Sequence, residues 1–139
     1  MTLEERRSWT YLAVAVVAYG AYVATILGKA ASAPLADVDY VPAMLWTIGI
    51  AIVFGIVLNI AQGIFTPRRE QTKDARDREI ELLGEHVGQA FLVIGGVAAL
   101  LLAIIEADYF YIANVVYLCF VLSAVVGSVA KVIVYRRGF

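Results

Sequence analysis

Four long apolar stretches constrain the fold of this chain more than any other feature of its sequence. A helix needs roughly 20 consecutive apolar residues to cross the hydrocarbon core of a bilayer. Each stretch is about that long, contains no Asp, Glu, Lys or Arg, and lacks the period-two alternation of a barrel strand, so each indicates a membrane helix. The four predicted spans are residues 9–27, 41–65, 87–105 and 109–130.

The predicted fold is all-α, with residues 1–139 forming a single domain, a bundle of four transmembrane helices. Apolar residues make up 62% of the chain, whereas a soluble domain has about 45–50%. This excess indicates that lipid is the solvent. Residues 106–108 are too few for anything but a tight turn between the last two spans. They predict that these two helices form an antiparallel hairpin.

The distribution of basic residues predicts the orientation of the bundle. Ten of the eleven Lys and Arg residues lie before the first span, between the second and third, or after the fourth, and only Lys29 lies on the other side. Lys and Arg are concentrated in the cytoplasmic loops of membrane proteins. We therefore expect both termini and the central loop, residues 66–86, to be cytoplasmic in a multi-pass protein of the bacterial inner membrane.

The central loop has the pattern of a charged helix in its second half. Thr66-Pro67 should end the second helix, because proline lacks the amide hydrogen, and Asp74 is a suitable N-cap for the next helix. A helix running from there into the third span would extend about 18 Å beyond the membrane. It is either a solvated extension whose charges set topology, or a docking surface for a partner or for the protein's own loop. The candidate partner-binding residues are Arg76, Asp77, Arg78, Glu81 and Glu85.

Four amide side chains are the candidate functional groups inside the membrane, where polar residues are rare and often functional. They could line a substrate path, or they could form hydrogen bonds between helices, each worth about 0.6–2 kcal/mol. No acidic or basic residue lies in the centre of any span, which disfavours a proton-coupled transporter. The four residues are Asn59, Gln62, Gln89 and Asn114.

Small residues recur at four-residue spacing in three of the spans and predict close helix–helix approaches. These approaches could lie within one bundle or between two copies of the chain. The repeats are Ala51, Gly55, Asn59 and Gly63 in the second span, Gly84 with Gly88 and Gly95 with Ala99 around the third, and Ser123 with Gly127 in the fourth.

Catalytic and cofactor motifs are missing from the sequence. With one His and one Cys, the chain has none of the paired ligands of ordinary zinc or haem sites. It also lacks a phosphate-binding glycine loop and a Ser–His–Asp arrangement on one side of the membrane. The net charge of −1 provides no field that would favour nucleic acid. We therefore expect no enzyme activity, no cofactor, no metal and no nucleic-acid partner.

The run DARDREI, from Asp74 to Ile80, precedes a glycine-containing start of an apolar helix. It resembles the D-E-R-D-like motif before the third helix in a domain-of-unknown-function family of small bacterial four-helix integral membrane proteins. The resemblance covers about Lys73 to the carboxyl terminus, and Ala75 stands where the family has an acidic residue. Some members are similar to proteins encoded beside small transcriptional regulators, so the resemblance implies a sensing or regulatory role.

These patterns favour a non-enzymatic inner-membrane protein that acts by association, as an accessory subunit or a membrane regulator or sensor. Its partners would be the lipid bilayer and either a second copy of the chain or another membrane or cytoplasmic protein. The alternative is a small homo-oligomeric transporter or channel whose path is lined by the four amide side chains. A lipid-binding or purely structural protein is a third possibility.

Overall fold

The computed structural model describes residues 3–34, 37–67 and 75–137. Over these residues the chain forms four α-helices, each long and apolar enough to cross a membrane, which confirms the predicted all-α fold. The helices are α1 (Leu3–Ala30), α2 (Val41–Ile64), α3 (Ala75–Ile104) and α4 (Tyr109–Arg137). Asp74, the predicted N-cap of α3, lies outside the described residues.

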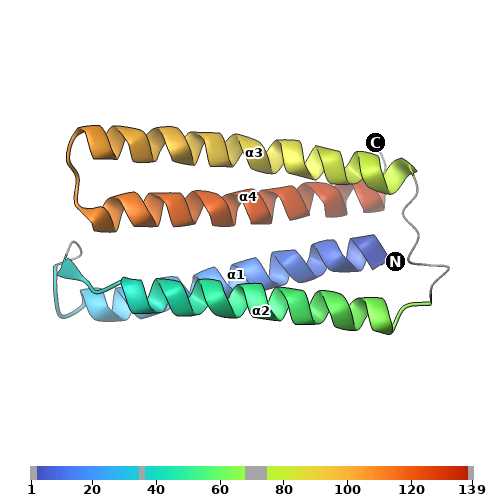
Figure 1. Ribbon diagram of the computed structural model, residues 1–139, viewed down its shortest axis with the longest axis horizontal. Helices are drawn as coiled ribbons and strands as arrows, with labels where there is room; N and C mark the ends of the chain where they lie inside the picture. Colours follow the sequence, from blue (N-terminus) through green and yellow to red (C-terminus); the bar gives the residue numbers. More distant parts are fainter. Residues whose placement is uncertain (1–2, 35–36, 68–74, 138–139) are drawn as a thin grey trace.

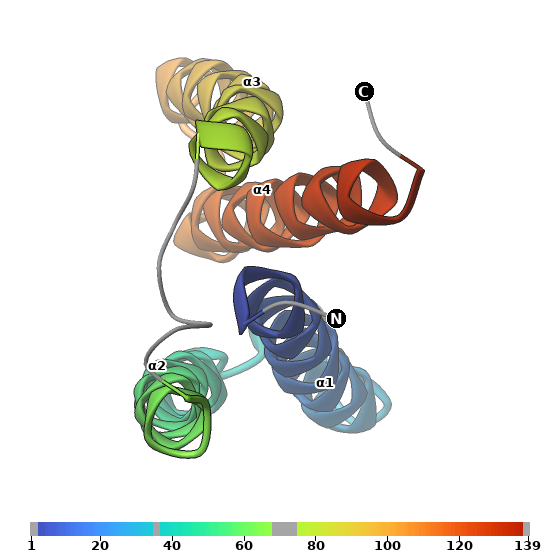
Figure 2. The same ribbon diagram turned by 90° about the vertical axis from the view of Figure 1, so that its right-hand side faces the viewer.

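The four helices lie roughly parallel to a common long axis, with both ends of the chain at the same end of the bundle (Figure 1). We call this the terminal end, and the opposite end, which holds the α3–α4 turn, the hairpin end. The packed pairs are α3 with α4, α4 with α1, and α1 with α2. Viewed along the axis, α4 lies between α3 and α1, with α2 beside α1 (Figure 2). The last helix of the sequence is therefore central in the bundle.

The α3 helix includes both the charged residues of the central loop from Ala75 onward and the third apolar stretch. It does not project alone beyond the apolar region, because α1 begins at Leu3 and α4 continues to Arg137 at the same end. Arg76 Nη2 donates to the carbonyl oxygen of Val134 at 3.3 Å, and Tyr135 Oη donates to Asp77 Oδ1 at 2.8 Å. The charged start of α3 is thus fastened to the end of α4.

Glu106 closes α3 in a left-handed backbone conformation, with φ of 57°. Its N–H donates to the carbonyl oxygen of Ala103 at 3.1 Å, and the N–H of Ala107 donates to that of Leu102 at 2.9 Å. These two bonds form a Schellman motif, which usually has glycine at the position that Glu106 occupies. A side chain at positive φ is strained, because its Cβ approaches a backbone oxygen. The turn sequence therefore holds strain that a glycine would remove.

Replacing Glu106 by glycine should raise the free energy of unfolding by about 0.5–1 kcal/mol, the strain relieved less the backbone entropy that glycine adds to the unfolded chain. The measurement is unfolding of the detergent-solubilised protein by heat or denaturant. Ala107→Gly is the matched control, because Glu106 alone among the described non-glycine residues has positive φ. This control should be neutral or destabilising, and equal stabilisation by both variants would contradict the assignment of strain to Glu106.

Glycines allow α3 and α4 to approach closely along most of their length. A Cβ atom added at Gly88 would lie 2.8 Å from Ser123 Oγ, and one added at Gly127 would lie 2.9 Å from the carbonyl oxygen of Gly84. An added Cβ at Gly95 would overlap Cys119. These small residues of α3 and α4 therefore pack against each other within one bundle. The sequence alone had left open whether they would instead meet a second copy of the chain.

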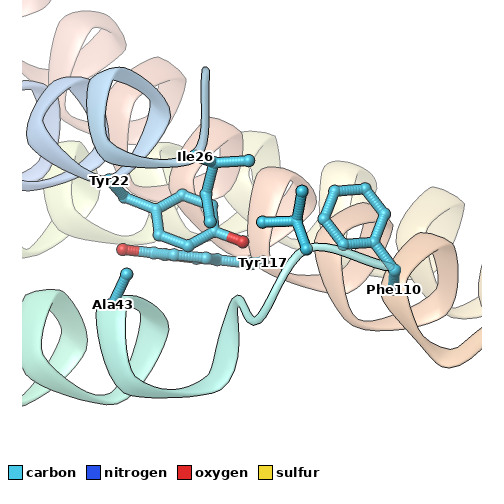
Figure 3. Packing of buried hydrophobic residues seen from close by; sticks show 6 residues of the cluster. Tyr22, Ile26, Ala43, Phe110 and Tyr117 are labelled. Carbon is cyan, nitrogen blue, oxygen red and sulfur yellow. The ribbon is translucent and has the colours of Figure 1, made fainter. Parts of the chain in front are cut away.

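A cluster of aromatic and aliphatic side chains forms the core of the hairpin end. Tyr22 of α1, 1% exposed, lies with its ring centroid 4.8 Å from that of Tyr117 of α4 (Figure 3). Thr47 Oγ1 of α2 and Tyr117 Oη share a hydrogen bond of 2.9 Å. The buried members are Tyr22, Ile26, Val38, Ala43, Phe110 and Tyr117. Three helices and the α1–α2 connection are joined here.

Candidate functional site

The α2 and α3 helices do not form one of the packed pairs of the bundle (Figure 2). A groove lies along the bundle beside both of them. It has a volume of about 650 Å³ and is lined by residues of all four helices. A second apolar groove of about 720 Å³ continues it toward the hairpin end and shares Ala15, Ala51, Ile52 and Ala124 with it. Volumes of roughly 300–1,000 Å³ are typical of ligand sites. We call the two together the α2–α3 groove.

The polar part of the α2–α3 groove lies toward the terminal end. Asn59 of α2, Glu85 and Gln89 of α3, and Ser123 and Lys131 of α4 line it there. Toward the hairpin end, the lining changes to Met44, Ile48, Val116, Phe120 and other apolar side chains. The groove is therefore amphipathic along its length.

A small polar cavity of about 200 Å³ adjoins the groove at the terminal end. It shares Tyr11, Asn59 and Lys131 with the groove. Arg7 Nη1 and Glu4 Oε1 form an ion pair of 3.2 Å in its wall. The charge of Arg7 is thus balanced locally by Glu4. Lys131 shares the cavity with Glu4 and Glu81 but forms no ion pair with a carboxylate of the described residues.

Asn59 and Gln62 join α2 to α1 at the terminal end. Asn59 Nδ2 donates to Tyr11 Oη at 2.9 Å, and Gln62 Nε2 donates to Thr10 Oγ1 at 2.6 Å. The oxygens Asn59 Oδ1 and Gln62 Oε1 are buried and accept no hydrogen bond from any described residue. The amide nitrogens are therefore used in helix packing, and the two buried amide oxygens are left without a donor from the described residues.

Asn114 does not line the groove and lies in the core of the hairpin end. It accepts a hydrogen bond from Tyr22 Oη, and its Nδ2 donates to the carbonyl oxygen of Phe110 at 2.7 Å. Gln89 is exposed in the groove and bonds to no residue within the described ranges. The structure thus brings Asn59 and Gln89 to one groove, and it places Asn114 elsewhere.

The five candidate partner-binding residues separate into two groups. Arg76 and Asp77 bond to the end of α4, while Glu81 lines the small polar cavity. Arg78 and Glu85 are exposed. Of the five, only these two are exposed and form no hydrogen bond or ion pair with another described residue.

Several interactions of the terminal end involve residues that the sequence did not single out. Glu5 is buried and accepts a hydrogen bond from Arg136 Nε at 3.0 Å, and the Arg136 guanidinium also lies over the Trp9 ring. Arg6 Nη2 donates to Thr66 Oγ1 at 3.3 Å. Pairing of Glu5 with Arg136 has no local signal, because the two are far apart in the sequence. Within the described ranges, no cluster of three His, Cys, Asp or Glu side chains could hold a metal ion.

Comparisons of this chain with protein-family models, with curated proteins and with solved structures found no match. The resemblance of residues 74–80 to the D-E-R-D-like motif stays a prediction.

Proposed function

We propose that this multi-pass membrane protein is non-enzymatic and acts by association, as an accessory subunit or a membrane regulator or sensor. Its termini and the charged start of α3 would face the cytoplasm of a bacterial cell. The observation that carries the proposal is an exposed face on the charged part of α3, centred on Leu82, which is 54% exposed. We call Arg78, Leu82 and Glu85 the α3 contact face.

The α3 contact face has the composition of a small protein interface. Arg78, Leu82 and Glu85 are spaced four and three residues apart, so they lie on one side of the helix. All three are exposed. An apolar side chain framed by charges matches the apolar centre and polar rim of protein–protein contacts. Such a face suits a protein partner better than lipid, because it precedes the apolar span and carries charges of both signs.

Rigid support favours binding by the α3 contact face. Arg76 and Asp77, on the neighbouring side of the helix, hold it against the end of α4. A surface already held in position loses less conformational entropy when a partner binds. Arg76 and Asp77 are therefore not part of the contact face, but their hydrogen bonds to α4 hold the helix that carries it.

Native mass spectrometry of the protein gently extracted from its own membrane tests the proposal. We expect a stoichiometric second polypeptide, or a second copy of the chain, in the extracted complex. Arg78→Glu should reduce its occupancy about tenfold, because a reversed charge meets a like charge in the partner. Arg137→Glu is the matched control, because Arg137 is also exposed at the terminal end but lies on α4. It should leave the occupancy unchanged.

The proposal would be overturned by a protein that is extracted as a monomer, or by a complex that responds equally to Arg78→Glu and Arg137→Glu. Arg78 makes no bond to another described residue, so its reversal should not unfold the bundle. The melting temperature of both variants checks this directly.

A small homo-oligomeric transporter or channel is the second candidate, and the polar part of the α2–α3 groove favours it. Asn59 and Gln89 line that groove. Gln62 and Asn114 do not line it, so the four amides do not form one path. Association through α3 is therefore the better supported function. A defined homo-oligomer that is insensitive to Arg78→Glu would favour the transporter or channel.

A further inference from the structure

The α2–α3 groove contains charged and polar groups whose bonding capacity is not used within the chain. Lys131 and Glu85 carry opposite charges and line the same groove, yet neither forms an ion pair with any residue in the described part of the chain. Gln89 is likewise unbonded, and Asn59 Oδ1 is a buried acceptor without a donor. A buried polar atom without a partner costs free energy. The groove therefore has both an unused cation and unused acceptors.

The position of Lys131 is set by the packing of α3 against α4. Its methylene chain crosses the backbone of Gly84, where an added Cβ would overlap the lysine side chain. Lys131 follows directly after the last apolar span, and Glu85 lies two residues before the start of the third span. Both charges are thus at the level where lipid headgroups begin. Further along the groove the walls are apolar, as acyl chains require.

We propose that the α2–α3 groove binds one phospholipid with a primary ammonium headgroup, from the leaflet that faces the terminal end. The phosphate would accept hydrogen bonds from Lys131 Nζ and Gln89 Nε2. The ammonium group would donate to the exposed carboxylate of Glu85, and an acyl chain would lie along the apolar part of the groove. One such headgroup supplies the anion and the hydrogen-bond donors that these side chains lack.

The carboxylates around the groove decide between lipid headgroups. Glu85 lines the groove, and Glu4 and Glu81 line the adjoining cavity. Arg7 is paired with Glu4. A purely anionic headgroup would therefore be repelled by Glu85 as strongly as it is attracted by Lys131. A quaternary ammonium headgroup has no N–H to donate to Glu85. Of the anionic, quaternary ammonium and primary ammonium headgroups, only the last offers a phosphate to Lys131 and an N–H donor to Glu85.

Native mass spectrometry of the purified protein, delipidated and then mixed with lipids, tests the proposal. The three probes are phosphatidylethanolamine, phosphatidylglycerol and phosphatidylcholine with identical acyl chains. We expect one phosphatidylethanolamine to be retained per chain, at an affinity about tenfold above the other two. Lys131→Met should abolish this preference while its side chain still covers Gly84. Arg137→Met, a charge removed at the same end but outside the groove, should preserve it.

A second readout separates loss of binding from loss of folding. Excess phosphatidylethanolamine should raise the melting temperature of the wild type, because a ligand stabilises the state that binds it. It should not raise that of Lys131→Met, although both proteins should melt at the same temperature without lipid. Glu85→Gln should weaken retention of phosphatidylethanolamine about fivefold. It should not weaken retention of phosphatidylglycerol.

Three results would overturn the proposal: equal retention of the three lipids, preferential retention of phosphatidylglycerol, or retention that Lys131→Met leaves unchanged. A protein or a second copy of this chain that occupies the groove would also overturn it, because cross-links from a cysteine placed at Gln89 would then reach a polypeptide. The lipid site shares Glu85 with the α3 contact face. The two proposals can still fail separately, because Arg78→Glu leaves Lys131, Gln89 and Glu85 in place and should not change lipid retention.

Discussion

Gly95→Leu should lower the free energy of unfolding by at least about 1–3 kcal/mol, the usual cost of overfilling a packed interface. An added Cβ at Gly95 already overlaps the Cβ and approaches the Sγ of Cys119 at 2.9 Å. Neither atom can move far, because Cys119 is buried in α4. The two helices would have to separate, and separation would also weaken the contacts at Gly88 and Gly127. Denaturant unfolding in detergent micelles is the measurement.

Gly96→Leu is a stringent control for that substitution. Gly96 is the next residue on the same helix, and an added Cβ there meets no atom within 4 Å. The expected change is within about 0.5 kcal/mol, as for other surface substitutions. Shortening the opposing side chain offers a rescue, because Gly95→Ala combined with Cys119→Gly should regain part of the stability lost in Gly95→Ala alone. Equal effects at Gly95 and Gly96 would show that α3 does not face α4 through Gly95.

Tyr22→Ala should cost about 3–5 kcal/mol, as truncation of a buried aromatic side chain does elsewhere. Tyr22 is 1% exposed, its ring packs against Tyr19 and Tyr117, and its hydroxyl donates to Asn114. Its loss would leave a cavity and an unsatisfied Asn114 oxygen at the contact between α1 and α4. Since α2 is packed mainly on α1, this substitution should loosen the α1–α2 pair from the α3–α4 pair.

Two further variants divide the effect of Tyr22 into its parts. Tyr22→Phe retains the ring and removes the hydroxyl, so it should cost only about 1 kcal/mol. Val17→Ala removes an apolar side chain from a position of α1 that is 70% exposed, and should cost less than about 0.5 kcal/mol. Unfolding curves of the three variants give the comparison. If Tyr22→Ala were no worse than Val17→Ala, the cluster at the hairpin end would not hold α1 to α4.

The sequence was sufficient for the class of the fold, because the signal for a membrane helix is strong and local. Uncharged stretches of 19 to 25 residues leave the backbone no other way to satisfy its hydrogen bonds in lipid. The turn between α3 and α4 was predicted for a similar reason, since residues 106–108 cannot connect helices that are far apart.

The arrangement of the helices could not be predicted, because lipid is as apolar as the side chains and no hydrophobic face separates core from surface. The pairing of Tyr22 with Asn114 depends on which helices become neighbours, and neither residue indicates this by itself. For the same reason, the glycine repeats predicted that helices approach closely but did not indicate which helix each repeat contacts. Gly95 and Gly96 are an example, because the sequence does not distinguish these adjacent glycines and only Gly95 faces α4.

The groove could not be predicted from the sequence either. Lys131 follows the fourth span, and Asn59 was a candidate either for a substrate path or for a hydrogen bond between helices. That the two line one groove follows from the way α2 packs on α1 while α3 packs on α4. A groove formed where two helices do not pack has no local pattern, because it depends on four elements at once.

The central position of the last helix has a consequence for how the protein is made. Translation supplies α1, α2 and α3 before α4, the helix on which both α1 and α3 pack. Until the ribosome has completed residues 109–137, the Tyr22 hydroxyl has no Asn114 to bond and the glycines of α3 have no surface to meet. Insertion of the first three helices can proceed one at a time and α1 can pair with α2, but the joining of α3 to that pair must await α4. A nascent chain halted before α4 therefore presents the α1–α2 pair and an isolated α3, which has no packed partner until α4 is made.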